Sequence, residues 1–153
     1  MAHVTFGSVE QLEARQGQEV VVSDWMELTQ ERIDRFAAAT DDFQWIHIDV
    51  DRARRESPFG APIAHGFLTL SLLSKFMNEC VDFGPSRMGV NYGGNRVRFT
   101  DPVPVGSRLR ARLTLARVDR IEGGVQITWN VVMERDGAAK PCLVAEWLTR
   151  RYT

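Results

Sequence analysis

The segment DFQWIHID, residues 42–49, places a carboxylate and an imidazole where they could act together on one small molecule. Asp42 and His47 are five residues apart, which on an ideal helix separates them by about 140° around the axis. The pair could therefore meet only in a turned loop. There the two groups could hold one water as a general acid and base. Histidine suits this role because its unperturbed pKa, about 6.5, lies close to working pH.

The same residues also have plainer interpretations. Asp42 could simply form a turn, and His47 could be a satisfied, half-buried ring; on this segment alone that interpretation is favoured. His47 and Asp49 have the spacing of a small metal site, but two ligands without a third are weak evidence, so we expect no metal. Asp41, next to Asp42, could face the site in its place.

A second cluster, GAPIAHG at residues 60–66, leads directly into an apolar run. Gly66 would lie in the first turn of a helix, where backbone N–H groups lack intrahelical partners and the helix dipole favours negative charge. Such an N–H could serve as an oxyanion hole for a carbonyl that gains charge. Alternatively, Gly66 permits tight packing and His65 is a capping or core residue, the role we favour for His65.

Two further polar positions could face the same pocket. Ser74 lies two turns along the predicted helix, although a serine there more often bonds a backbone carbonyl. Arg98 and Arg96 could bind phosphates, but solvating one face of a sheet is the favoured role.

These residues need elements to position them, and apolar periodicity indicates which. Residues 64–80 are predicted to form a buried helix, because apolar side chains surround most of its circumference. Thr29 is the predicted N-cap of a helix over residues 30–39. Residues 40–50 are predicted to be an ordered loop, and 51–56 a short exposed helix. The apolar residues of the predicted buried helix are Phe67, Leu68, Leu70, Leu72, Leu73, Phe76 and Met77.

The last third of the chain is typical of strands. Residues 109–115 and 125–133 alternate apolar and polar side chains, and a last strand is predicted over 143–152. A short β-branched run lies at 20–22 and a further strand at 97–99, with a bend predicted at 92–94. Asp136 and Gly137 are a signal for a two-residue hairpin. We predict an α+β fold in which a curled antiparallel sheet wraps the apolar helix, and a homodimer formed through an edge strand.

Length and composition exclude several classes of protein. The 153 residues fit one domain, 1–153, and the net charge of −1 argues against a nucleic-acid binder. The start of the sequence lacks the pattern of a secretory signal, and the longest apolar stretch is too short and polar to span a bilayer. The two cysteines are too few for a disulfide scaffold and are predicted to be buried thiols. We expect a cytoplasmic protein that does not bind membranes.

Together the two clusters resemble the MaoC-like dehydratases, the (R)-specific enoyl-CoA hydratase group of hot-dog folds. The family motif runs approximately G-D-x-N-P-x-H-x-D, followed by P-I-x-H-G-x-L and the central helix. Asp42, His47 and Asp49 match the first element, and PIAHGFL at residues 62–68 matches the second. The sequence departs from the motif at Asp41, Gln44 and Trp45, which replace the family's Gly, Asn and Pro. Gln44 and Trp45 are most similar to the nodulation protein N-like branch.

The resemblance implies a hot-dog fold and reversible addition of water to a trans-2-enoyl-CoA thioester, giving a 3-hydroxyacyl-CoA. It implies Asp42 and His47 as the catalytic pair and no cofactor. Gly66 would stabilise the thioester oxygen. Residues implied in substrate binding are Gln44, His65, Ser74 and Arg98.

Three alternatives remain open at this point. A hot-dog thioesterase would direct the activated water at the thioester carbonyl instead. A non-catalytic protein could have kept the pocket only to bind acyl thioesters. A purely structural dimer module would leave the spacing of Asp42 and His47, and the glycine that opens the helix, as coincidences.

Overall fold

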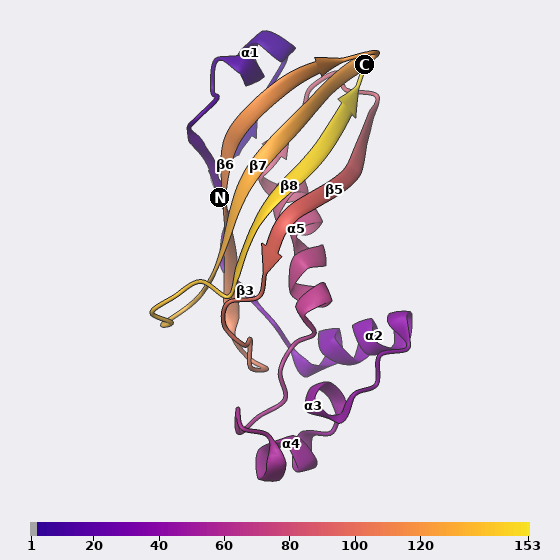
Figure 1. The fold of residues 1–153 in the computed structure, drawn as a ribbon, viewed down its shortest axis with the longest axis vertical. Helices are drawn as coiled ribbons and strands as arrows, with labels where there is room; N and C mark the ends of the chain where they lie inside the picture. Colours follow the sequence, from indigo (N-terminus) through magenta and orange to yellow (C-terminus); the bar gives the residue numbers. More distant parts are fainter. Residues whose placement is uncertain (1–2) are drawn as a thin grey trace.

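A six-stranded antiparallel sheet curls around the long helix α5 (Gly66–Cys80) in the computed structural model, which describes residues 3–153 (Figure 1). The main path of the sheet runs β2-β6-β7-β8-β5, and β3 pairs with β6 beside β2. The predicted α+β architecture is confirmed. The strands are β2 (Glu19–Val22), β3 (Met26–Glu27), β5 (Met88–Arg98), β6 (Arg108–Ile121), β7 (Gly124–Arg135) and β8 (Leu143–Tyr152).

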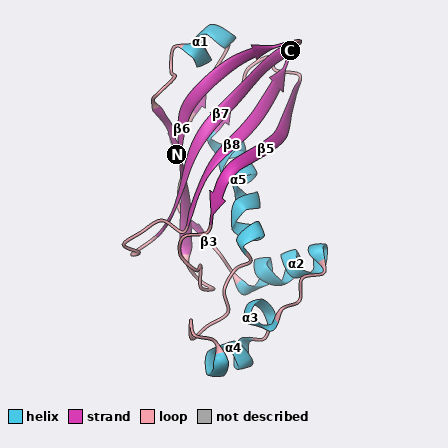
Figure 2. Ribbon diagram, viewed as in Figure 1, coloured by secondary structure: helices cyan, strands magenta, loops and turns pink. Residues whose placement is uncertain are grey.

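The smaller elements gather at the two ends of the molecule (Figure 2). Helix α1 (Val9–Glu13) lies at one end, and β1 (Val4–Thr5) pairs in parallel with β4 (Val81–Asp82). At the other end, beyond the first residue of α5, lie α2 (Gln30–Thr40), α3 (Trp45–Ile48) and α4 (Val50–Glu56). This second end contains both chemically suggestive clusters of the sequence.

The strand alternation produces one apolar face. In β6 the odd-numbered residues from Leu109 to Leu115 are fully buried, and the arginines between them point outward. These arginines pair with acidic groups on neighbouring strands, such as Arg112 with Glu19 at 2.8 Å. Burying each large apolar side chain contributes about 1.5–3 kcal/mol, so this face holds the sheet on the helix.

Helix α5 is less completely buried than predicted. Leu68, Leu72 and Phe76 lie in the core, but the side chain of Phe67 is 72% exposed. The exposed face also carries Ser74, because residues 67, 71, 74 and 78 fall on one side of the helix. The prediction of an all-round buried helix was therefore wrong for this face, which the sheet does not cover. The helix also starts at Gly66, two residues later than predicted.

Three other local predictions differ from the structure. Residues 45–48, predicted as loop, form the one-turn helix α3. The predicted bend at 92–94 lies inside β5, where the pairing with β8 shifts register between Asn91 and Gly93. Asp136 and Gly137 do form a turn, but β8 begins only at Leu143, so the connection is longer than a two-residue hairpin. By contrast, Thr29 caps α2 as predicted, accepting from the Arg32 N–H at 3.3 Å.

Both cysteines are free and buried, as predicted. Burial raises the pKa of the Cys142 thiol to about 11 and also raises that of Cys80. Among the helices of residues 3–153, none combines the length and the apolar character needed to cross a membrane.

Candidate active site

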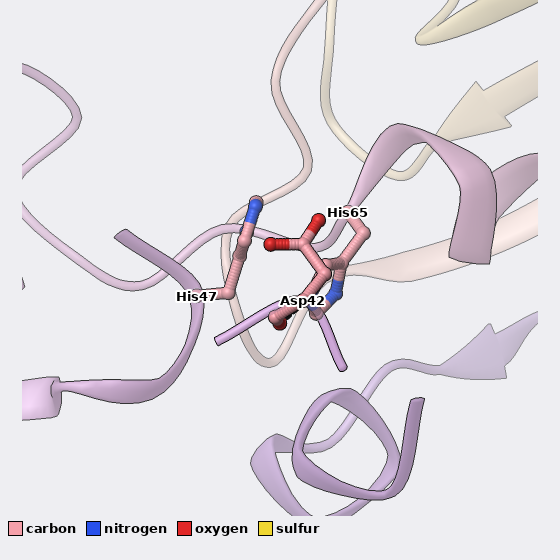
Figure 3. A group of neighbouring side chains, drawn as sticks. All are labelled: Asp42, His47 and His65. Atoms are coloured by element: carbon pink, nitrogen blue, oxygen red, sulfur yellow. Dashed lines mark hydrogen bonds between the residues drawn. The ribbon is translucent and has the colours of Figure 1, made fainter. Parts of the chain in front are cut away.

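The turn between α2 and α3 brings Asp42 next to His47. Helix α2 ends at Thr40, and its C-cap Asp41 has a left-handed φ of 56° that reverses the chain. Asp42 then leads through Gln44 into α3, which carries His47. Ligand atoms of Asp42, His47 and His65 all lie within 4.8 Å of one another, and Figure 3 shows the three side chains grouped together. The predicted turned loop thus exists, with a short helix completing it.

The hydrogen bonding of His47 fixes which ring nitrogen is free. Its Nδ1 lies 2.7 Å from the carbonyl oxygen of Ile63. A carbonyl oxygen can only accept, so Nδ1 carries the hydrogen and the Nε2 lone pair is left available. Burial lowers the pKa of His47, with a smaller lowering from His65; the Ile63 bond and Asp42 act in the opposite direction. A neutral ring of this tautomer can accept a proton at Nε2.

His65 supports both members of the pair from behind. Its ring stacks on that of His47, with centroids 3.8 Å apart, and touches Phe36 on α2. Its Nε2 donates to the backbone carbonyl oxygen of Asp42 at 3.0 Å. Only 2% of His65 is exposed, so the residue holds Asp42 and His47 in place. This agrees with the structural role that the sequence favoured for it.

Gln30 is a supporting residue that the sequence did not indicate. Its side-chain Nε2 donates to the backbone carbonyl of His47 at 2.8 Å and to the Asp34 carboxylate at 2.9 Å. It therefore ties the start of α2 to α3. As the first residue of an amphipathic helix, Gln30 gave no signal that distinguished it from an ordinary solvated position.

Gly66 opens α5 and lines the same cavity as His47, one of about 320 Å³. The segment before it is fixed by Ala64, whose N–H donates to the Val103 carbonyl at 2.8 Å. Within residues 3–153, no hydrogen bond uses the Gly66 N–H. A Cβ at this position would lie 3.0 Å from the ring of Phe99, another residue that the sequence analysis did not assign to the site. Gly66 therefore has a free N–H, and the Phe99 ring lies next to it.

Of the remaining predicted substrate-binding residues, Gln44 adjoins this centre, and its backbone N–H donates to the Asp42 carboxylate at 3.4 Å. Gln44 precedes α3, is exposed, and makes no side-chain capping bond. Ser74 lines a different cavity, between α5 and strands β5 and β8. Arg98 is exposed and donates to the backbone carbonyl of Val97 at 2.8 Å. The structure therefore groups Asp42, His47 and His65, adds Gly66 through the shared cavity, and leaves Ser74 and Arg98 outside it.

The same three side chains could be considered as metal ligands. His47 Nδ1 and His65 Nε2 are hydrogen-bonded to backbone carbonyls, so only His47 Nε2 and His65 Nδ1 are left for an ion. The two rings are stacked with only 25° between their planes, so their lone pairs do not converge on one point. A tetrahedral ion needs converging ligands at about 2.0–2.1 Å. The arrangement suits a water held between Asp42 and His47 better than a metal.

Comparison with known proteins gives a consistent result. Residues 11–135 match the model of the MaoC like domain family. The chain is 47% identical over 147 residues to 3-hydroxyacyl-thioester dehydratase Z of Mycobacterium tuberculosis, covering 95% of this chain and 97% of that protein. It is 44% identical over 144 residues to Nodulation protein N of Rhizobium leguminosarum bv. viciae, covering 93% and 89%.

Solved structures share the fold. A monoamine oxidase regulatory protein from Archaeoglobus superposes with a TM-score of 0.80 at 24% identity, covering 100% of this chain and 99% of the other. The unliganded R-hydratase PhaJ1 from Pseudomonas aeruginosa superposes with a TM-score of 0.68 at 25% identity, covering 88% and 79%. The curled sheet and its central helix are therefore a shared scaffold, and the predicted hot-dog fold is confirmed.

Proposed function

The chain belongs to the MaoC-like domain family, and from this premise we propose that it is an (R)-specific enoyl-CoA hydratase. It would add water reversibly to a trans-2-enoyl-CoA thioester to give a 3-hydroxyacyl-CoA. The observation that carries this proposal is the pairing of the Asp42 carboxylate with a buried His47 whose Nε2 is free. A relative 47% identical over nearly the whole chain is named a 3-hydroxyacyl-thioester dehydratase, which is the same reaction in reverse.

The proposed chemistry needs only proton transfers. Asp42 and His47 hold one water, and His47 Nε2 removes a proton as the hydroxyl oxygen bonds to the β-carbon. The electrons of the carbon–carbon double bond move toward the thioester carbonyl and form an enolate. His47 then gives the proton that it accepted to the α-carbon, which completes the 3-hydroxyacyl product and restores the neutral ring. Each atom of the water ends on the substrate, so no redox partner is consumed.

Gly66 supplies the charge stabilisation in this proposal. The enolate places negative charge on the thioester oxygen, and the free N–H at the start of α5 suits an oxyanion. His47 and Gly66 line one cavity, so a substrate between them could reach both groups. One oxyanion donor of this kind typically contributes about 10²–10³ in turnover.

The decisive test is a two-channel assay on crotonyl-CoA that follows enoyl absorbance and free thiol together. Loss of absorbance without thiol is expected and would establish hydration. Release of thiol would contradict the proposal and make a thioesterase the better description. If neither signal changes, the assay is repeated with longer enoyl chains. Binding of a saturated acyl-CoA without turnover at any length would identify a binding protein instead.

The proposal includes a homodimer formed along the edge strand β5. This strand ends the order of the sheet, so one of its edges is unpaired, and long open edges invite pairing with another chain. Large apolar side chains are exposed along it, among them Met88, Val90 and Tyr92. Sedimentation equilibrium should give twice the mass of the chain. Changing Val90 to lysine should shift the molecule toward monomer.

We also expect the protein to act in the cytoplasm. Both of its buried cysteines are unpaired, which fits a compartment that keeps thiols reduced. Cell fractionation with an antibody against the chain would test this expectation, and recovery from a secreted fraction would contradict it.

A further inference from the structure

An arginine occupies the core-facing side of β8 far from the candidate active site. The inward residues of this strand alternate from Leu143 through Trp147 and Thr149, and residue 151 continues the series. Arg151 pairs across the sheet with Val125, which is 3% exposed. The alternation calls for an apolar residue here, so a cation at this position needs an explanation.

The Arg151 guanidinium has no acidic partner in the described part of the chain. It lies over the ring of Phe83, 3.8 Å from the centroid, and its Nε is buried without a hydrogen-bond partner. A Cβ on Gly89, the residue opposite on β5, would lie 2.1 Å from Arg151 Nη1, so a larger residue there would force the guanidinium to move from this position. Partial burial of the guanidinium lowers the pKa of Arg151.

The neighbouring Arg150 provides a contrast within the same strand. It faces outward, donates from Nε to Gln126 at 3.0 Å and lies over the ring of Tyr92. Unlike Arg151, it has a conventional polar partner.

Arg151 lines the polar end of a groove along α5. A cavity of about 280 Å³ is lined by Arg151 together with Thr149 and Asn78. A second cavity, of about 360 Å³, is mostly apolar and extends to Phe67, the residue after Gly66. The two cavities share three lining residues, Ser74, Asn91 and Trp147. Together they form one groove that is apolar near the start of the helix and cationic near its end.

We propose that this groove binds an acyl chain whose far end carries a carboxylate, and that Arg151 binds this carboxylate. A guanidinium matches a carboxylate in charge and can hold it through two parallel hydrogen bonds. From Gly66 to Asn78 the helix rises about 18 Å, so the chain would follow α5 for roughly three turns. The proposal rests on the proposed function, because it takes the acyl thioester as the ligand and makes Arg151 a specificity-determining residue.

The test compares two enoyl-CoA substrates of equal length, one ending in a carboxylate and one in a methyl group, across a series of lengths. The wild type should show a higher kcat/KM for the carboxylate at the matching length. Arg151→Met, which keeps an apolar stem against Phe83, should lose this preference by roughly 10- to 100-fold, as expected for a charge-assisted pair. Arg150→Met should keep it and should turn over crotonyl-CoA like the wild type.

Calorimetry with a saturated ω-carboxyacyl-CoA separates this proposal from the proposed function. The saturated compound has no double bond and cannot be hydrated, so its affinity for the wild type and Arg151→Met is measured without turnover by a hydratase. Equal affinity of both proteins would overturn the role of Arg151. Absence of turnover with every enoyl-CoA would overturn the hydratase and leave the binding result standing. A shift from dimer to monomer in Arg151→Met would also overturn the proposal, because the cation would then serve a second copy.

Discussion

His47 donates from Nδ1 to the carbonyl oxygen of Ile63 at 2.7 Å, and the neighbouring Ile46 carbonyl accepts from the Ile63 N–H at 3.0 Å. These two bonds fasten α3 to the segment that enters α5. Ile63 is three residues before Gly66, so these bonds fix the position of His47 relative to the N-terminus of α5. Positioning of this kind matters because small displacements of a catalytic group can cost about 10² in rate.

The first prediction concerns the catalytic pair itself. Asp42→Asn removes the carboxylate but keeps its size, and His47→Gln removes the base. Each should lower kcat by roughly 10²–10⁴, the usual range for an acid/base group, in the crotonyl-CoA assay.

The control for this pair is Asp49→Asn. Asp49 caps α4, accepting from the Arg52 N–H at 3.0 Å, and makes no contact with the His47 ring among the contacts of the described residues. Asparagine caps helices about as well as aspartate, so this variant should change stability little and keep turnover near wild type. Wild-type turnover in either Asp42→Asn or His47→Gln would rule out the assigned roles.

The second prediction is the pH dependence of activity. Burial lowers the pKa of His47 from its ordinary value of 6.5, so the neutral base persists below that pH. A profile of kcat/KM against pH should therefore have its acid limb below pH 6.5. An acid limb at or above pH 6.5 would show that another group controls the rate.

The same pKa shift predicts how stability depends on pH. Between the lowered folded pKa and 6.5 the unfolded chain binds more protons at His47 than the folded chain. The free energy of unfolding should therefore rise with pH across this window and be unaffected by His47 above it. Denaturant titrations of His47→Gln should show a flatter dependence in this window than those of the wild type.

The sequence predicted those parts of the molecule that local pattern controls. Side chains alternate in β6 and β7 because one face of each strand is exposed to solvent and the other is buried. Thr29 caps α2 through a hydrogen bond to a residue only three positions away. Helix α3 was missed because its single turn is too short to show periodicity and is held by the Gln30 side chain, 17 residues away from His47. The exposure of Phe67 was missed because periodicity does not reveal which side of a helix the sheet leaves open.

In the candidate site, too, local pattern predicted some features, and contacts between distant segments determined the others. The spacing of Asp42 and His47 indicated a loop that brings them together. The tautomer of His47, the stacking of His65 and the wall formed by Phe99 all depend on contacts between distant segments. No property of residues 63 or 99 taken alone indicates those contacts.

The third prediction concerns the turn that orients Asp42. Asp41 has a φ of 56°, in the region that glycine adopts freely and β-branched residues avoid. Asp41→Gly should change the free energy of unfolding by less than about 1 kcal/mol, since relief of strain is offset by a freer unfolded chain. Asp41→Val should lose about 1–2 kcal/mol and reduce turnover as Asp42 shifts. Equal stability of the two variants, measured by urea unfolding, would contradict this role of the turn.

The fourth prediction isolates the N–H of Gly66. Proline is tolerated at the first position of a helix, and His65, with φ −58° and ψ 138°, already has a conformation that a following proline accepts. Gly66→Pro therefore removes the N–H and can retain α5. Gly66→Ala is its matched control, because both variants bring a Cβ 3.0 Å from the Phe99 ring but only alanine keeps the N–H. Phe99 is 47% exposed and can yield, so both should fold.

Alanine should lower kcat by at most about 10²-fold, through displacement of Phe99 into the cavity shared with His47. Proline should lower it by a further 10²–10³ or so, the usual effect of one lost oxyanion donor. Circular dichroism and thermal unfolding confirm that the helix persists in each variant. If the two variants have the same kcat while both are folded, the N–H does not stabilise the transition state. Gly66 would then serve only the close packing of α5 against Phe99.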